Sequence, residues 1–146
     1  MVLWRISRFA DLRGIGGLKA SGRWHDAGFP IVYLADSPAG ALLEVCVHTA
    51  SNDVPPEFTL LQVEGPDLKF PSISLDSLSD DWTVRLDITR ELGSKWLREG
   101  TSVLMRVPSA IVPRTSNFLF NPAHADAKRF TITSKYSYPF DARIKQ

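Results

Sequence analysis

The sequence has little of what would place the protein outside the cytoplasm or in a membrane. Cys46 is the only cysteine among 146 residues, so an intrachain disulfide is excluded and a reducing cytoplasm is the expected compartment. No apolar run approaches the roughly 20 residues that a membrane-spanning helix needs. Residues 1–5 show no signal-peptide pattern. These absences predict a cytoplasmic protein with no membrane contact.

The sequence also lacks a large net charge and a cluster of metal-ligating residues. Its 17 Lys and Arg and 16 Asp and Glu give a net charge of +1. This balance argues against direct nucleic-acid binding through a broad basic field, because phosphate neutralisation supplies most of such affinity. His25, His48 and His124 are far apart, and no Cys/His cluster surrounds them. We therefore expect no metal site.

The length of 146 residues predicts one domain over residues 1–146. Ser37 as a cap and Pro38 at the first helical position predict a helix that runs to residue 48 or 50. A second helix is predicted over 87–99, with Gly100 as its C-cap. Residues 8–22 and 66–82 are expected to be irregular loops. Strands are predicted at 2–7, 31–34, 58–63, 102–107, 117–120 and 129–134. More strands than helices, without strict alternation, favour an α+β domain.

Glu44 is the most informative single residue, because it interrupts the most apolar stretch of the chain, residues 41–47. One interpretation places Glu44 on a solvent-exposed stripe of its helix. The other has Glu44 and His48, four residues apart on one helix face, look into a cleft. The residues alone leave both open.

The loop that ends in Ser21-Gly22-Arg23-Trp24-His25 is a second candidate. Glycine permits close approach of the backbone, Arg23 offers a planar fork of donors to phosphate, and Trp24 offers a stacking face. The alternative is a surface arginine beside a core tryptophan. Ser109 and Asn121 follow strands and are compatible with plain turns, and Tyr33 is compatible with the core.

Taken in order, the short motifs resemble the RES-domain family, which is named for an Arg, a Glu and a Ser. Those three residues correspond to Arg23, Glu44 and Ser109 here, and where many members have Asn this chain has His25. The motifs are Leu3-Trp4-Arg5, Gly22-Arg23-Trp24-His25, Val32-Tyr33-Leu34, Ala41-Leu42-Leu43-Glu44-Val45, Val107-Pro108-Ser109-Ala110-Ile111-Val112-Pro113, Asn121-Pro122-Ala123-His124 and Pro139-Phe140-Asp141-Ala142-Arg143.

The resemblance implies a bacterial toxin of a toxin–antitoxin pair. It implies a compact single domain with a mixed, mostly antiparallel sheet, similar to ADP-ribosyltransferases. NAD is then a substrate rather than a cofactor, and is degraded by hydrolysis or phosphorolysis. The implied partner is an Xre-like helix-turn-helix antitoxin that blocks the active site and binds DNA. The resemblance also admits a homodimer within that complex.

The same resemblance implies residue roles. Cleavage of the nicotinamide–ribose bond builds positive charge on the ribose, and nicotinamide leaves as a neutral molecule. One carboxylate, Glu44, can therefore suffice. Arg23 with Arg5 would hold the pyrophosphate, Tyr33 would stack on nicotinamide, and Ser109 would bond to the substrate. Trp24 and Asn121 are secondary candidates for NAD contacts.

Two alternatives remain open from the sequence. The first is a mono-ADP-ribosyltransferase that modifies a cellular protein, because the sequence does not show whether water, phosphate or a side chain accepts ADP-ribose. The second is a non-catalytic module that only binds a repressor.

Overall fold

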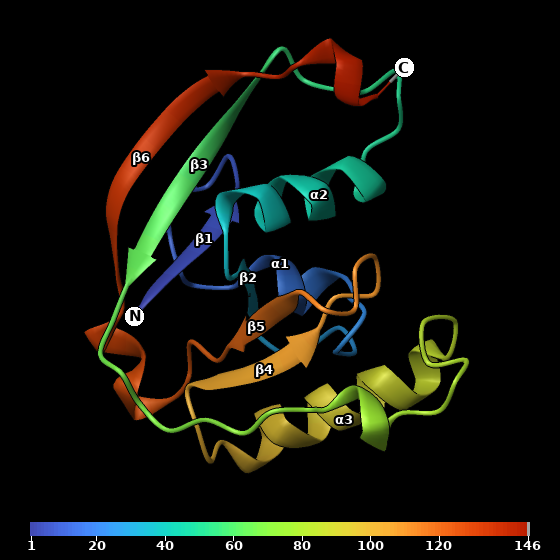
Figure 1. Cartoon of the computed structure of the whole chain (residues 1–146). Coiled ribbons are helices and arrows are strands. Elements are labelled where there is room, and N and C mark those ends of the chain that lie inside the picture. Colours follow the sequence, from blue (N-terminus) through green and yellow to red (C-terminus); the bar gives the residue numbers. More distant parts are fainter. Residues whose placement is uncertain (146) are drawn as a thin grey trace.

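The computed structural model describes residues 1–145 and contains six strands, three α-helices and three short 3₁₀ helices (Figure 1). Every predicted strand and helix is present. In chain order the elements are β1 (Val2–Ile6), α1 (Gly16–Lys19), β2 (Val32–Ala35), α2 (Pro38–His48), β3 (Glu57–Glu64), η1 (Leu75–Ser77), α3 (Leu86–Glu99), β4 (Leu104–Pro108), β5 (Ser116–Phe120), η2 (Ala125–Arg129), β6 (Thr131–Pro139) and η3 (Ala142–Ile144).

The strands form one sheet in the order β4-β5-β2-β1-β3-β6, and all neighbouring strands are antiparallel. Within residues 1–145, parallel pairing is limited to an isolated bridge between Ser72 and Arg106. The expectation of an α+β domain with a mostly antiparallel sheet is confirmed.

The sheet is divided near its middle. β1 pairs with β3 over five residue pairs, but β1 and β2 share a single pair, Trp4 with Ala35. We call β1, β3 and β6 the outer half-sheet, and β2, β5 and β4 the inner half-sheet. In Figure 1, the outer half curves away from the inner half, and α2 lies between them. Space for a site therefore opens where the two halves diverge.

Helix α2 begins as the sequence predicts. The Ser37 side chain accepts a hydrogen bond from the backbone N–H of Gly40 at 3.0 Å, and Pro38 is the first helical residue. The helix ends at His48, where Thr49 adopts an extended conformation. Lys145 Nζ donates hydrogen bonds to the carbonyls of Cys46 and Thr49, which satisfies two acceptors at this end.

Helix α3 packs on the Leu119 face of the inner half-sheet, where Trp96 and Leu97 join Met105, Val107 and Leu119 in one buried cluster. Gly100, with φ of 60°, ends the helix as predicted. Trp96 packs in a buried cluster with Trp24, and its indole N–H donates to Ser102 at 2.8 Å. Gly93 allows the close approach, because a Cβ there would lie 1.6 Å from the Trp24 carbonyl oxygen. The loop that carries Arg23 is therefore fixed against α3.

The structure departs from the predictions mainly in the connections. The predicted loop 8–22 contains the single turn α1, and the predicted loop 66–82 contains η1. The second loop also extends the sheet: Ile73 N–H donates to Arg106 O at 2.9 Å, and Arg106 N–H donates to Pro71 O at 3.0 Å. These backbone bonds depend on the neighbouring strand and have no local pattern.

Strand ends also differ from the predicted ranges. β4 starts at Leu104 rather than residue 102, because its pairing with β5 begins at Leu104 and Phe120. The Ser102 hydroxyl before it bonds the Trp96 indole and the Leu104 carbonyl. β6 runs over Thr131–Pro139 rather than 129–134. Its added residues are exposed and pair with β3. Tyr136 and Tyr138 continue the alternation of Phe130 and Ile132, but the polar Ser134 interrupts it, so the predicted strand stops there.

Candidate active site

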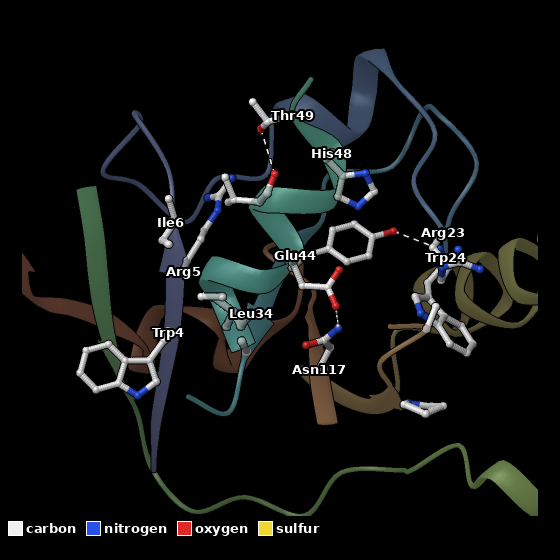
Figure 2. A pocket seen from close by; sticks show the side chains of 16 residues that line it. Trp4, Arg5, Ile6, Arg23, Trp24, Leu34, Glu44, His48, Thr49 and Asn117 are labelled. Carbon is white, nitrogen blue, oxygen red and sulfur yellow. Dashed lines mark hydrogen bonds between the residues drawn. The ribbon is translucent and has the colours of Figure 1, made fainter. Parts of the chain in front are cut away.

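A cavity of about 360 Å³ lies where the two half-sheets diverge, and α2 forms one wall. Arg5 comes from β1, Tyr33 from β2, Glu44 from α2, Asn117 from β5 and Arg23 from the loop before β2 (Figure 2). These residues span more than 110 positions of the sequence. The fold therefore brings together one carboxylate, two guanidinium groups, an aromatic ring and an amide.

Glu44 is half-buried and lines the cavity, so it does not lie on an exposed stripe. Both of its hydrogen bonds are to Oε1: Asn117 Nδ2 donates at 2.7 Å and Ser109 Oγ donates at 3.1 Å. Figure 2 shows the Asn117 amide directed at this oxygen. Two donors on one oxygen fix the carboxylate plane and leave Oε2 for the cavity. The arrangement presents a negative charge in a fixed orientation.

Ser109 lies behind Glu44 rather than in the cavity wall, and it is 2% exposed. Its oxygen accepts hydrogen bonds from the backbone N–H groups of Ile111 at 3.1 Å and Val112 at 3.3 Å. Those two donors orient the hydroxyl hydrogen toward Glu44. Ser109 thus bonds the Glu44 carboxylate, and its expected direct bond to substrate stays a prediction.

Asn117 is the residue that the sequence analysis missed. It lies on strand β5 directly before the apolar run 118–120, in which Phe118 and Phe120 face one hydrophobic cluster and Leu119 faces the other. Asn117 shares the Leu119 face, which is the cavity side. A polar side chain on a strand with both faces buried was the signal available in the sequence.

The two arginines line the cavity from different elements. Arg23 Nη1 donates to the Thr83 carbonyl at 2.7 Å, which holds the side chain while other N–H groups stay available. Arg5 Nη1 donates to the Asp11 carbonyl at 3.2 Å. Burial lowers the pKa of Arg5 below its ordinary value, and the charge of Asp11 opposes this shift. The cavity therefore offers donors suited to anionic oxygens.

The ring of Tyr33 faces the cavity, and its hydroxyl is bonded within the protein. Its ring lines the cavity, while its hydroxyl oxygen lies 2.7 Å from His25 Nδ1 and accepts a hydrogen bond from Trp24 N–H at 3.1 Å. Burial raises the pKa of Tyr33 to about 12, so the hydroxyl stays protonated at neutral pH. The anchored hydroxyl leaves a ring available for stacking.

The remaining predicted residues divide into two groups. Trp24 borders the cavity but is 2% exposed, and its ring packs on Trp82 with centroids 6.0 Å apart. Asn121 does not line the cavity. It is 4% exposed, and its side-chain oxygen accepts a hydrogen bond from Ala123 N–H at 3.0 Å. Its side chain bonds within the turn after β5, and its expected NAD contact stays a prediction.

His48 was considered with Glu44 and lines the cavity as an exposed side chain (Figure 2). Cys46, on the same helix, is buried. Within residues 1–145, no group of three His, Cys, Asp or Glu side chains is placed to hold a metal ion. None of the helices described is long and apolar enough to cross a membrane.

The fold has a counterpart of known structure. The crystal structure of the M. tuberculosis MbcT-MbcA toxin-antitoxin complex contains a chain that superimposes with a TM-score of 0.73 at 18% identity, covering 99% of this chain and 86% of that one. This likeness defines the class of fold: a single α+β domain with a six-stranded antiparallel sheet.

The family follows from sequence. The RES domain matches residues 2–141, and the chain therefore belongs to the RES domain family. It is 48% identical to "Toxin Res" of Pseudomonas putida, over 99% of both chains. It is 36% identical to "Prs ADP-ribosylating toxin" of a Sphingobium species, over 97% of this chain and 94% of that one. The resemblance found in the sequence is confirmed, and the relatives matched here are toxins.

Proposed function

We propose that the protein is the toxin of a toxin–antitoxin pair and degrades NAD by cleaving its nicotinamide–ribose bond in the cavity. The observation that carries this proposal is the fixed carboxylate of Glu44, which faces a cavity that also holds two guanidinium groups and an aromatic ring. NAD has a matching group for each: its ribose becomes cationic opposite the carboxylate, its two phosphates match the guanidinium groups, and its nicotinamide ring matches the aromatic ring.

The bond that breaks joins ribose C1 to the nicotinamide nitrogen. Its electron pair goes to the nitrogen, so nicotinamide leaves neutral and needs no general acid. Positive charge then develops on the ribose. Glu44 stabilises that charge, because its orientation is set before the reaction by Asn117 and Ser109. Attack by water oxygen on C1 releases one proton and gives ADP-ribose, whereas attack by phosphate oxygen gives the phosphorylated product.

The roles of the other residues follow from their places. Arg23 and Arg5 bind the pyrophosphate through their N–H groups. Tyr33 stacks on nicotinamide with a ring whose hydroxyl is already bonded within the protein. Trp24 supports this wall from the core.

A second candidate function is transfer of ADP-ribose to a protein, and the name of the Sphingobium relative favours it. The same bond breaks in both reactions, so the cavity chemistry is shared. The two functions differ only in the nucleophile that reaches C1.

We also propose an antitoxin partner of the Xre-like helix-turn-helix class that covers the cavity, with the complex in the cytoplasm. The structural counterpart from M. tuberculosis was crystallised as a toxin-antitoxin complex, which supports a partner of this kind. A homodimer of the toxin within that complex belongs to the same proposal.

The decisive experiment is an NAD assay on the purified protein, with and without inorganic phosphate. Nicotinamide release with free ADP-ribose indicates hydrolysis, and dependence on phosphate indicates phosphorolysis. With labelled NAD and lysate, label retained on protein indicates ADP-ribosyl transfer. Glu44→Gln is the inactive variant, and Glu57→Gln, at an exposed site on β3, is the matched control. Unchanged NAD in every arm would instead support the non-catalytic, repressor-binding module.

A further inference from the structure

His25 lies behind Tyr33, outside the wall of the 360 Å³ cavity, and it is 2% exposed. Its Nε2 atom is 3.2 Å from the Gly17 carbonyl, which can only accept a hydrogen bond. The hydrogen of a neutral imidazole therefore belongs on Nε2, and Nδ1 carries the free lone pair. That lone pair faces the Tyr33 hydroxyl at 2.7 Å and the Gly22 N–H at 3.2 Å.

The directions of the hydrogen bonds follow from this tautomer. The Tyr33 hydroxyl donates its hydrogen to His25 Nδ1, and its oxygen accepts from Trp24 N–H at 3.1 Å. The tyrosine tip is thus bonded once as donor and once as acceptor. A hydrogen on Nδ1, in the other neutral tautomer or in the cation, removes the acceptor of the Tyr33 hydroxyl hydrogen.

The backbone at two glycines lies close to the rings of His25 and Tyr33. A Cβ at Gly22 would lie 2.4 Å from the Tyr33 hydroxyl oxygen and 3.0 Å from His25 Nδ1. A Cβ at Gly17 would lie 2.6 Å from a methyl carbon of Ile31 and 3.1 Å from His25 Nε2. Both glycines are needed for the backbone to approach the two rings this closely.

We infer that His25 is a positioning residue for Tyr33, and that only its neutral Nε2–H form holds the tyrosine ring in place for stacking. This inference rests on the proposed function, in which Tyr33 contacts nicotinamide. His25 itself does not reach that cavity. It borders a smaller cavity of about 190 Å³, together with Arg5 and Tyr33.

Protonation of His25 would remove the acceptor that the Tyr33 hydroxyl needs and would place an N–H opposite the N–H of Gly22. The charged groups around His25 act in opposite directions: the carboxylate of Asp26 favours a cation, and Arg90 on α3, which donates to the Gly22 carbonyl at 2.8 Å, disfavours one. The backbone of Gly17 and Ala20 also favours a cation, and burial, the largest effect, disfavours one. Burial lowers the pKa of His25 below its ordinary value of 6.5. The arrangement therefore holds at neutral pH and is lost as the pH falls through that lowered pKa.

Two substitutions separate the two sides of the imidazole. His25→Asn can place an amide oxygen near the position of Nδ1, so it retains an acceptor for Tyr33 and does not titrate. His25→Gln can place an amide nitrogen near the position of Nε2, so it retains the bond to Gly17 but leaves the tyrosine hydroxyl without its acceptor. We expect kcat/KM for NAD to fall about tenfold in His25→Gln, the rate equivalent of one hydrogen bond. We expect His25→Asn to stay within about threefold of wild type and to lose the acidic decline in activity.

A double-mutant cycle with Tyr33→Phe distinguishes positioning from a general effect on folding. Without the tyrosine hydroxyl, His25→Gln has nothing further to lose, so its additional cost should vanish. Equal costs in the two backgrounds, or an acidic decline unchanged in His25→Asn, would overturn the inference.

Nitrogen-15 NMR of the histidine rings in the full chain tests the same inference without activity. We expect His25 to be neutral at pH 7 with its hydrogen on Nε2, and its signal to shift in Tyr33→Phe. A hydrogen on Nδ1, or a signal indifferent to Tyr33→Phe, would refute the positioning role. Failure to cleave NAD would overturn the proposed function alone, because the NMR result decides the hydrogen-bonding arrangement independently.

Discussion

Replacing Glu44 with glutamine changes one charge and almost nothing else, and the structure determines how the new side chain must sit. Asn117 and Ser109 both donate to Oε1, so the carbonyl oxygen of Glu44→Gln takes that position. The amide nitrogen then occupies the place of Oε2 and faces the cavity. An anionic acceptor is thereby replaced by a neutral donor at the point where positive charge develops.

The expected loss of rate can be worked from the charge alone. Two unit charges about 4 Å apart interact by about 4 kcal/mol at an effective dielectric constant of about 20. Removal of one preorganised electrostatic partner typically costs about 2.7–4 kcal/mol, or 10²–10³ in kcat. We therefore expect turnover of NAD by Glu44→Gln to fall about 10²–10³-fold.

The NAD affinity and the folding stability of Glu44→Gln should change much less than its turnover. NAD carries a cationic ring and two anionic phosphates, so a single charge change in the wall has opposing effects on its affinity. The two hydrogen bonds to Oε1 weaken by about 1 kcal/mol each when the acceptor becomes neutral. The lower cost of burying an amide than a carboxylate offsets this loss.

The assay is nicotinamide release under single-turnover conditions, with NAD affinity measured by calorimetry and the unfolding midpoint measured by circular dichroism. Glu57→Gln, an exposed change of the same chemistry, should behave as wild type. If Glu44→Gln is folded, binds NAD and turns it over at the wild-type rate, the carboxylate has no electrostatic role and the proposed mechanism is wrong.

Three further substitutions test the supporting structure. Ser109→Ala should lower kcat less than the change at Glu44 and cost about 1–3 kcal/mol of stability, because it leaves two backbone N–H groups without their acceptor; urea unfolding beside kinetics checks both. Gly93→Ala should destabilise the fold by at least about 3 kcal/mol, since its Cβ meets the Trp24 carbonyl, and a wild-type melting temperature would contradict this close approach. Arg23→Ala should weaken NAD binding more than Arg23→Lys, by roughly 1.5–3 kcal/mol for each charge-assisted bond lost; equal calorimetric affinities for both variants and wild type would remove this side chain from the site.

Local signals in the sequence were sufficient for the two long helices, α2 and α3, but not for the single turn α1. Ser37 and Pro38 specify the start of α2 through side-chain and backbone geometry, and Gly100 ends α3 because it adopts positive φ. The pairing of strands that are distant in the sequence could not be predicted from such local signals. The far end of β6 is exposed and pairs with β3, and Ser134 interrupts the alternation of Phe130 and Ile132 that Tyr136 and Tyr138 would otherwise continue.

The candidate site shows the same division. Arg23, Tyr33 and Glu44 were identified from their motifs, and the fold brings all three to one cavity. Asn117 was missed because its significance depends on Glu44, which is 73 positions away in the sequence. Asn121 lies outside the cavity wall, which its motif did not indicate, because a motif near a strand end does not reveal which way the chain turns after it.

The single residue pair that joins β1 to β2 also has a mechanical consequence. Arg5 belongs to the outer half-sheet, whereas Tyr33 and Asn117 belong to the inner half-sheet, so the distance between them is set by the angle at which the halves meet. Few backbone hydrogen bonds cross this seam, and the packing of α2 against both β1 and β2 must hold the angle instead. The two half-sheets can therefore be regarded as two rigid bodies whose relative angle is set by α2. Substitutions far from the cavity that tilt either half-sheet will change the positions of Arg5, Tyr33 and Asn117 relative to one another. A ligand that contacts both half-sheets will reduce the motion of one half relative to the other.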